Sequence, residues 1–198
     1  FIVGFDNDPD DIFERQINFI HDSAIPLAMV GLLTALPDTQ LWKRLEREGR
    51  LVHQSSGNNT DCSLNFVPKM DRERLVEGYK AILRTIYSSE EFYQRALDCL
   101  SRVRNDAAAL QRVSVIGVLR SFIKIVLRLG VRDRERLRFW KYLFRVVRLY
   151  PSSLGNGIAL AAMGYHFRKV TEIHCAKVPL TGFAGDGTQL VGEVSFAD

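Results

Sequence analysis

Cysteine and histidine side chains are the groups in this chain that could hold a metal ion. The chain has three cysteines and four histidines. Zinc and iron–sulfur centres need such ligands at clustered spacings, for example CxxC or CxxxCxxC, and the chain contains neither. The sequence therefore predicts no metal site and no disulfide framework, and the sparse cysteines favour a reducing, cytoplasmic location. Among these cysteines and histidines, only His174 and Cys175 are adjacent in the sequence. The others are Cys62, Cys99, His21, His53 and His166.

An acidic cluster near the start of the chain is the second candidate for chemistry. Its spacing resembles the beginning of a calcium loop, but Pro9 and the missing distal glycine and glutamate argue against one. We expect Asp8 to cap a helix that begins at Pro9, with Asp10 and Asp11 in its first turn. Asp6 follows a buried strand, where barrel enzymes place their sites, so we expect it to line one.

Three common phosphate-binding or nucleophile motifs are absent. No GxGxxG follows a strand, no GxxxxGK[ST] occurs, and no GxSxG is present. The sequence therefore excludes the usual dinucleotide fold, a P-loop and a nucleophile elbow as the source of activity.

Two apolar runs and an intervening helix dominate the first fifty residues. Residues 1–5 and 27–34 have the length and composition of strands buried on both faces, and residues 9–23 show helical periodicity. Together they form one right-handed βαβ unit. Two parallel strands need neighbours, and no later segment supplies them, so we expect those neighbours upstream of Phe1 or on another chain. The predicted fold is the end of a partial parallel β/α (TIM-like) barrel.

The rest of the chain is predicted to be helical. A helix after Pro37-Asp38-Thr39 ends before Gly49, and further helices begin at Asp71 and at the capping box of Ser88. The fold class is thus an α/β fragment followed by an all-α domain, with a loosely ordered tail. The remaining helices are expected at 107–129, 133–149 and 155–172; the expected divisions are 1–49 (barrel end), 50–68 (linker), 69–175 (helical domain) and 176–198 (tail).

Charge is distributed unevenly along the chain. Residues 1–100 carry 11 Lys/Arg against 16 Asp/Glu, whereas residues 112–148 carry 11 Lys/Arg against Asp133 and Glu135 alone. The basic segment is either a set of solvated helix faces packed on the core or a contact surface for an anionic membrane. Arg120, Lys124 and Arg128 rule out a membrane-spanning helix within 113–131. No nucleic-acid reader motif is present, so no nucleic-acid partner is expected.

Two runs resemble the late strands of radical S-adenosylmethionine enzymes, particularly those with a cobalamin-binding domain. Phe1-Ile2-Val3-Gly4-Phe5-Asp6-Asn7-Asp8 is similar to the fifth barrel strand. The run from Leu32 to Trp42 is similar to the sixth strand and its exit, with Pro37-Asp38-Thr39 where the family often has Pro-Gly-Thr. Asn65-Phe66-Val67-Pro68 and Leu75-Val76-Glu77-Gly78-Tyr79 are similar to the helical C-terminal domain of the group that includes hopanoid methylases.

This resemblance implies cofactors and site residues. S-adenosylmethionine, a [4Fe–4S] cluster and cobalamin are the expected cofactors of the parent protein. Ile2 and Gly4 would touch the adenosine, while Asp6, Leu33 and Thr34 would line the barrel mouth. The cluster ligands form a CxxxCxxC that this chain lacks, so they must lie in an upstream part of the same enzyme, and this chain alone should be inactive.

Two functional hypotheses follow. In the first, the chain is the C-terminal portion of a radical S-adenosylmethionine enzyme that transfers a methyl group from methylcobalamin to an unactivated carbon of a small-molecule or lipid substrate. In the second, it is a non-catalytic helical module that binds a partner or an anionic membrane surface. Both hypotheses predict a cytoplasmic protein. Peripheral membrane contact through residues 112–148 is expected if the substrate is a membrane lipid or the partner is a membrane surface.

Overall fold

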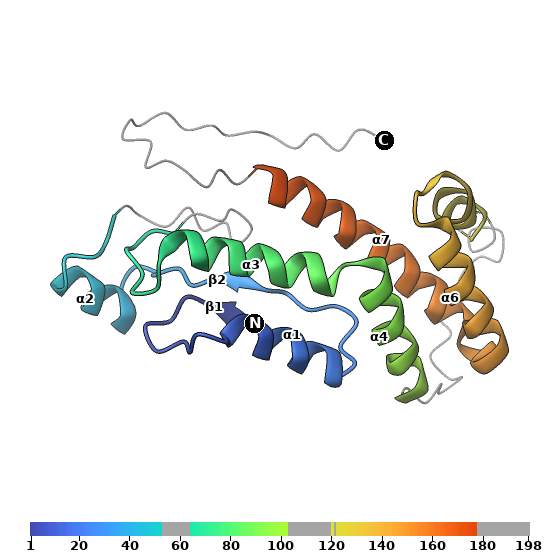
Figure 1. Cartoon of the computed structure of the whole chain (residues 1–198), viewed down its shortest axis with the longest axis horizontal. Helices are drawn as coiled ribbons and strands as arrows, with labels where there is room; N and C mark the ends of the chain where they lie inside the picture. The colour runs from blue at the N-terminus through green and yellow to red at the C-terminus, as the bar shows by residue number, and fades with distance from the viewer. Residues whose placement is uncertain (53–63, 103–119, 121, 178–198) are drawn as a thin grey trace.

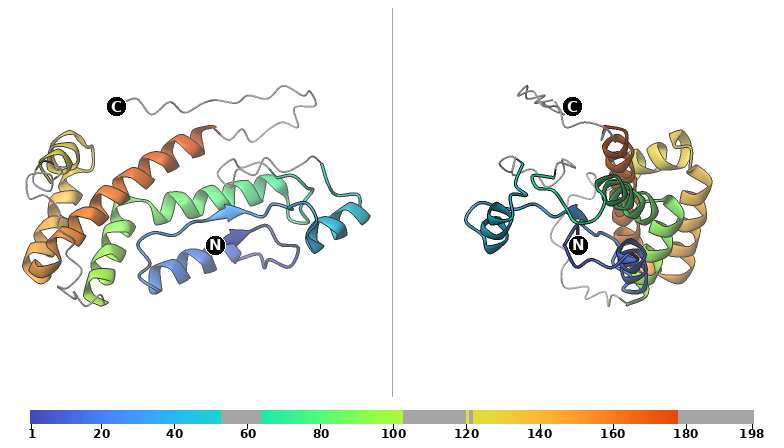
Figure 2. Two further views of the ribbon diagram at one scale, coloured as in Figure 1. Left: turned by 180° about the vertical axis from the view of Figure 1, so that it is seen from behind. Right: turned by 60° about the vertical axis from the view of Figure 1, so that its left-hand side comes forward.

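The computed structural model describes residues 1–52, 64–102, 120 and 122–177 of the chain (Figure 1). A small parallel sheet and helix α1 lie beside helix α3, and helices α4, α6 and α7 build the other end of the molecule (Figures 1 and 2). The elements are β1 (Ile2–Val3), α1 (Ile12–Asp22), β2 (Gly31–Leu32), α2 (Gln40–Arg47), α3 (Arg72–Ile86), α4 (Ser89–Arg102), η2 (Val126–Arg132), α6 (Arg136–Leu149), η3 (Pro151–Ser153) and α7 (Leu154–Lys177).

The predicted parallel pairing of the first two strands is confirmed. Ile2 is opposite Gly31 and Val3 is opposite Leu32, and the Leu33 amide donates to the Val3 carbonyl at 2.8 Å. Each regular strand is only two residues long, shorter than the apolar runs that predicted it. Among the described residues the sheet has no third strand, so each strand has one edge without a neighbour to extend its regular pairing. The barrel itself stays a prediction.

Helix α1 begins later than the sequence predicted. Asp8 does not cap it, because the Asp8 carboxylate accepts hydrogen bonds from the amides of Gly4 and Phe5 at 2.7 and 2.9 Å. The helix begins at Ile12, and its N-cap residue Asp11 makes no side-chain capping bond. The predicted start at Pro9 was therefore wrong, since Asp8 stabilises the loop after β1 instead.

Helix α2 has the ends that the sequence predicted. The Thr39 hydroxyl accepts the Trp42 amide at 3.2 Å at its start. At its end Gly49 has φ +66°, and the Arg50 amide reaches the Leu45 carbonyl at 2.9 Å, which is a Schellman motif. The chain then leaves α2 with the Arg50 side chain directed toward β1.

Helices α3 and α4 confirm the predicted caps in part. The Asp71 carboxylate accepts the Arg74 amide at 2.9 Å, and the Ser88 hydroxyl accepts the Glu91 amide at 3.4 Å. The reciprocal half of the capping box does not form, because the Ser88 amide donates to the Thr85 carbonyl. Both helices bury apolar faces against the common core, including Leu75, Ile82, Phe92, Ala96 and Leu100.

The C-terminal helices pack across α4. Helix α7 contacts α3, α4 and α6, and Phe139 and Val146 of α6 are fully buried in this core. The predicted helix break at Gly130 was wrong: residues 126–132 form a π-helix that includes this glycine. Trp140 covers Gly130 and donates its indole N–H to the Gly130 carbonyl at 2.9 Å. Most of the predicted helix 107–129, and residues 178–198 of the tail, lie outside the described residues.

Candidate functional site

The loop after β1 is fixed by the Asp8 carboxylate and by the shape of Gly4. Gly4 has φ +109°, a conformation that residues with a side chain rarely adopt. A Cβ atom there would lie 3.2 Å from Leu75 of α3 and 3.5 Å from the Leu33 Cβ. Gly4 therefore lets the end of β1 approach both α3 and the neighbouring strand.

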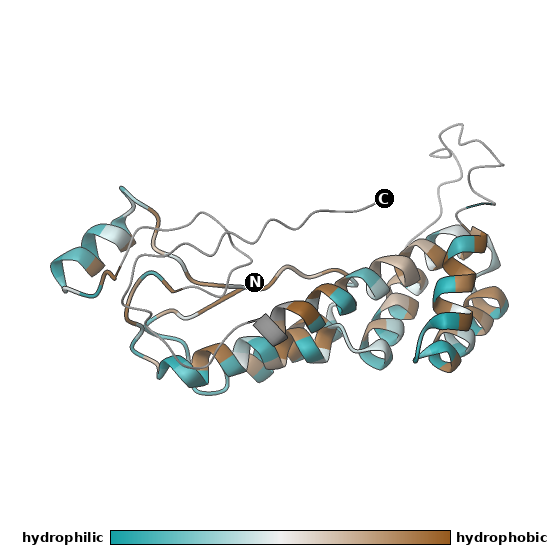
Figure 3. Cartoon of the chain, turned by 90° about the horizontal axis from the view of Figure 1, so that it is seen from above, coloured by the Kyte–Doolittle hydropathy of each residue, from teal (hydrophilic) through white to brown (hydrophobic). Residues whose placement is uncertain are grey.

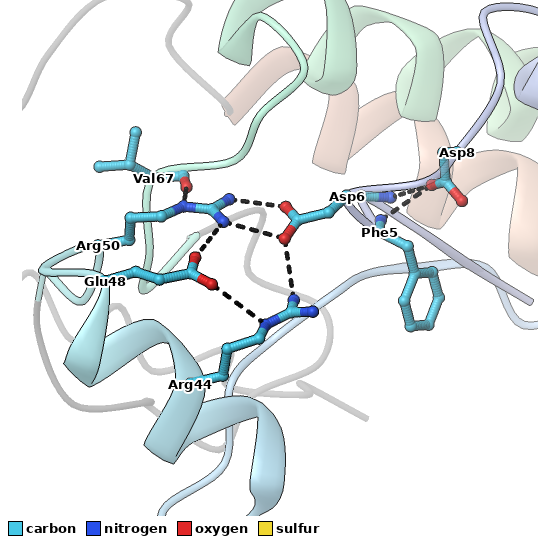
Figure 4. Close-up of polar contacts among 8 residues, drawn as sticks. Phe5, Asp6, Asp8, Arg44, Glu48, Arg50 and Val67 are labelled. Atoms are coloured by element: carbon cyan, nitrogen blue, oxygen red, sulfur yellow. Dashed lines mark hydrogen bonds and ion pairs between the residues drawn. The ribbon is translucent and has the colours of Figure 1, made fainter.

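Asp6 lies at the centre of an ion-pair network that joins this loop to α2 (Figure 4). Arg50 binds both carboxylate oxygens of Asp6, at 2.7 and 2.9 Å, and Arg44 adds a further contact at 2.9 Å. Glu48 pairs with Arg50 at 2.8 Å, and the Arg50 Nε donates to the Val67 carbonyl at 2.8 Å. Asp6 thus ties together three segments that are distant in the sequence.

This network decides the protonation state of Asp6. The hydrogen bond from Arg50, with the nearby charges of Arg50 and Arg44, lowers the pKa of the Asp6 carboxyl below its ordinary value, although burial opposes the shift. The carboxylate is ionised and both of its oxygens are occupied by arginine. In this arrangement Asp6 positions the loop and is poorly suited to accept a proton.

The exit of β2 is shaped by a tight turn and by Asn65. The Thr39 amide donates to the Leu36 carbonyl, and Asp38 has φ +64° after Pro37, which is the arrangement of a type II turn. Asp38 stands where radical S-adenosylmethionine enzymes, which this run resembles, often have glycine, the residue best suited to this conformation.

A buried amide holds the same exit from the other side. The Asn65 side chain accepts the Ala35 amide at 2.9 Å and donates to the Ala35 carbonyl at 2.7 Å, so it replaces a strand partner for this residue.

Three of the five predicted site residues line one apolar hollow. This hollow has a volume of about 450 Å³ and lies between the sheet and helices α3 and α7. Ile2, Leu33 and Thr34 contribute to it, whereas Gly4 and Asp6 do not. The helices supply mainly apolar and aromatic side chains: Tyr79, Leu83, Tyr87, Phe167, Val170 and Thr171.

Tyr87 brings a hydroxyl group to this hollow, and that hydroxyl is already engaged. Its hydroxyl donates to the Ala28 carbonyl at 2.8 Å, and its ring stacks on Phe167 with centroids 5.1 Å apart. Burial raises the pKa of Tyr87, so the hydroxyl stays protonated. The hollow is suited to hold an apolar or aromatic group and offers little for acid–base catalysis.

Within the described residues, no three His, Cys, Asp or Glu side chains gather closely enough to hold a metal ion. Cys99 and Cys175 are free thiols, and burial raises the pKa of each, so both stay protonated. Cys62 and His53 lie outside the described residues. The described residues therefore do not offer the clustered thiolates that a [4Fe–4S] cluster needs.

The sequence did not predict several residues that shape this site. Arg44 and Arg50 hold Asp6. Gly49 predicted the end of α2, and so indicated only that Arg50 lies just beyond this helix. Nothing in the local pattern pointed to Asn65 as the partner of Ala35. The helical wall of the hollow was also missed, since it depends on how α3 and α7 pack.

In the part of the chain that the structure describes, none of the helices combines the length and the apolar content needed to cross a bilayer.

Comparison with known proteins defines the class to which the chain belongs. Residues 39–178 match the family model "Domain of unknown function (DUF4070)", and the chain belongs to this family. It is 31% identical over 176 residues to the "Uncharacterized methyltransferase sll1242" of Synechocystis sp. strain PCC 6803, covering 87% of this chain and 33% of that protein. It is also 31% identical over 171 residues to the "Hopanoid C-2 methylase" of Rhodopseudomonas palustris strain TIE-1, covering 83% of this chain and 31% of that protein.

These matches confirm the predicted relationship to the hopanoid methylase-like group. The chain spans about a third of the length of the two curated relatives. No solved structure matches it.

Proposed function

We propose that the chain is the C-terminal part of a radical S-adenosylmethionine methyltransferase that uses cobalamin and methylates an unactivated carbon. Two relatives whose names describe methyl transfer support the reaction class. The strand motifs that resemble radical S-adenosylmethionine enzymes support the chemistry. The upstream part of the same protein would supply the cluster ligands, the remaining barrel strands and the cobalamin-binding domain.

The observation that carries this proposal is the composition of the apolar hollow. Ile2, Leu33 and Thr34 come from the two strands that resemble the cofactor-binding end of the barrel. Their side chains share the hollow with α3 and α7, which belong to the family-defining domain. The helical domain therefore supplies one wall of a site whose other wall is the end of the barrel.

Such a wall has a physical function in this chemistry. When bound, S-adenosylmethionine supplies a carbon-centred radical, and a reactive radical must be kept from water and from stray hydrogen donors. Leu83, Tyr87 and Phe167 present apolar surface to the hollow, and the Tyr87 hydroxyl is held by Ala28. These residues would exclude water and orient an apolar substrate, such as a lipid, beside the cofactor.

The test uses the longer protein that contains this chain. The upstream sequence should contain a CxxxCxxC, and the purified protein with its iron–sulfur cluster should cleave S-adenosylmethionine to 5′-deoxyadenosine. Ile2→Asp should lower this cleavage by about tenfold or more, because it brings an unpaired charge into the apolar hollow. Ile173→Asp is the matched control, since Ile173 is similarly exposed on α7 but does not line the hollow.

Two results would contradict the proposal. One is an upstream sequence without the cysteine motif. The other is equal S-adenosylmethionine cleavage by the two variants, which would mean that the hollow is not part of the cofactor site.

A further inference from the structure

The surface of residues 123–148, which include η2 and most of α6, carries a repeating pair of residues. Seven exposed apolar side chains there are each followed directly by an exposed Lys or Arg. The apolar members are between 44% and 78% exposed, which is unusual for a regular set of large side chains. The pairs, called here the apolar–basic surface, are Ile123–Lys124, Leu127–Arg128, Val131–Arg132, Leu137–Arg138, Trp140–Lys141, Phe144–Arg145 and Val147–Arg148.

Helix geometry turns these pairs into two neighbouring stripes. Successive residues on an α-helix lie about 100° apart, so an apolar stripe on α6 runs beside a basic one. Neither stripe is the core-facing side of the helix, which is formed by Phe139, Tyr142, Leu143 and Val146. Brown hydrophobic and teal hydrophilic positions alternate along this helix in Figure 3. Packing against the core explains the buried side of α6 and leaves the exposed apolar stripe unexplained.

The charge of this surface is strongly positive. Residues 122–149 contain nine Lys/Arg and only two carboxylates. Asp133 is paired with Arg168, and Glu135 is paired with Arg138. Among the described residues, no carboxylate pairs with Arg132 or Arg134. The surface thus presents cations that the described residues do not neutralise.

The basic stripe leads into a hollow of about 810 Å³. Tyr165 lies under it, and the Arg128 Nε donates to the Tyr165 hydroxyl at 2.9 Å. Arginine binds phosphate oxygens through two parallel hydrogen bonds, so the hollow is suited to a phosphate group. Three carboxylates in the lining, Asp133, Glu135 and Glu172, pair with Arg168, Arg138 and Lys169. The cationic side chains outnumber them by six to three: Arg128, Arg132, Arg134, Arg138, Arg168 and Lys169.

The position of this surface argues against the upstream part of the enzyme as its occupant. The sheet, whose outer edges call for further strands, lies toward the other end of the molecule from η2 and α6 (Figures 1 and 2). A bilayer with anionic headgroups matches both stripes, because it offers apolar chains and phosphates at one interface.

We propose that the apolar–basic surface docks the protein peripherally on an anionic phospholipid bilayer. Leu137 and Phe144 insert at the level of the headgroups, beside the exposed edge of Trp140, whose indole stays bound to Gly130. The basic stripe binds lipid phosphates, and the hollow over Tyr165 receives one headgroup. This proposal does not depend on the methyl-transfer chemistry.

Vesicle flotation tests the docking with the 198-residue chain and, separately, with the longer protein. The protein should float with vesicles of phosphatidylcholine and phosphatidylglycerol, should float little with phosphatidylcholine alone, and should be released by salt. Replacing Arg132 and Arg134 with Gln should weaken binding by about fivefold for each cation removed. Replacing Leu137 and Phe144 with Ser should weaken it by about tenfold or more.

Matched controls remove equivalent groups elsewhere. Lys43→Gln with Arg47→Gln removes two exposed cations from α2, and Phe19→Ser with Ile173→Ser removes two exposed apolar side chains. Both control proteins should bind like the unaltered chain, and circular dichroism should show the same helix content in all five proteins.

Four results would overturn the docking proposal. The first two are equal binding to both kinds of vesicle, and surface variants that bind like the controls. The third is self-association without lipid that the Leu137 and Phe144 substitutions abolish, which would assign the surface to a second copy of the chain. The fourth is release by inorganic phosphate but not by sodium chloride of equal ionic strength, which would assign the hollow to a free anion.

Discussion

Asp6 shows how a single carboxylate can look catalytic in the sequence and hold structure together in the fold. Its place after a buried strand predicted a site residue, and sequence reasoning could go no further because its partners come from residues 44 and 50. A carboxylate that accepts three hydrogen bonds from two arginines is stabilised in its charged form. We infer that Asp6 orients the loop that carries Gly4, and so acts on the site indirectly.

Asp6→Asn should lower the free energy of unfolding by about 2 kcal/mol at neutral pH, because Arg50 would lose the more buried of its two charged partners and keep only Glu48. Urea unfolding measures this difference. Asp11→Asn is the control, since Asp11 makes a comparable 2.7 Å pair with Arg15 on the exposed surface and should matter little. Equal effects of the two substitutions would show that burial adds nothing to the Asp6 network.

The same pair of proteins tests the protonation of Asp6. Because the folded state lowers the pKa of Asp6, its stabilising contribution is complete above the ordinary carboxyl value of 3.8. It is lost as the pH falls through the lower folded value. The stability difference between the unaltered chain and Asp6→Asn should therefore be constant near neutral pH and shrink below 3.8. A difference that grows on acidification would contradict the assignment.

Asp38 tests whether the turn after β2 has kept the conformation of the family motif. Its φ of +64° is readily adopted by glycine, tolerated by aspartate and strongly disfavoured for β-branched residues. Asp38→Gly should leave the stability nearly unchanged, whereas Asp38→Val should reduce it by about 1–2 kcal/mol. Thermal unfolding of both variants measures this. Equal stability of the Gly and Val variants would exclude a left-handed residue here.

The helix ends that depend on residues close in the sequence were predicted best. Asp71, Ser88 and Thr39 lie at the starts of helices, and Gly49 ends one, because capping uses residues within four positions. The two misses have different causes. Asp8 bonds to the amides of Gly4 and Phe5, which are as near in the sequence as the helix start, so two local partners competed for one carboxylate. Gly130 lies in a π-helix covered by Trp140, a partner ten residues away that the local pattern did not indicate.

Gly164 tests the packing of α7 on α4. A Cβ atom there would lie 2.3 Å from the buried ring of Phe92, so Gly164→Ala must push the two helices apart. This overpacking should exceed the better helix propensity of alanine and destabilise the protein by about 1–2 kcal/mol. Gly155→Ala in the same helix faces open space and should be neutral or slightly stabilising. Urea unfolding compares them, and equal stability would mean that α7 can shift freely on α4.

For the whole molecule, the question is which surfaces a longer chain would cover. Phe1, Ile2, Phe5 and Met29 are large apolar side chains exposed around the sheet, and the hydrogen-bond ladder runs back to Phe1. The parallel pair was predictable because its apolar runs show no alternation. Its outer neighbours were not, since strand partners in a parallel sheet come from distant sequence. The exposed residues of α6 have a different character, because each is accompanied by a cation.

Hydrogen exchange should separate these two kinds of exposed surface. In a protein as long as the two relatives, the amides of residues 2–5 and 29–34 should exchange more slowly than in the 198-residue chain, because new strands would pair with the open edges of the sheet. The side chains of Leu137 and Phe144 should remain accessible in both proteins, which labelling of cysteines substituted at these positions would measure. Unchanged exchange of the strand amides would contradict the barrel. Protection of positions 137 and 144 from labelling in the longer protein without lipid would mean that the enzyme itself covers the apolar–basic surface. The strand amides therefore test the barrel, which depends on backbone pairing. The α6 side chains independently test the docking proposal, which depends on an interface that only a bilayer provides.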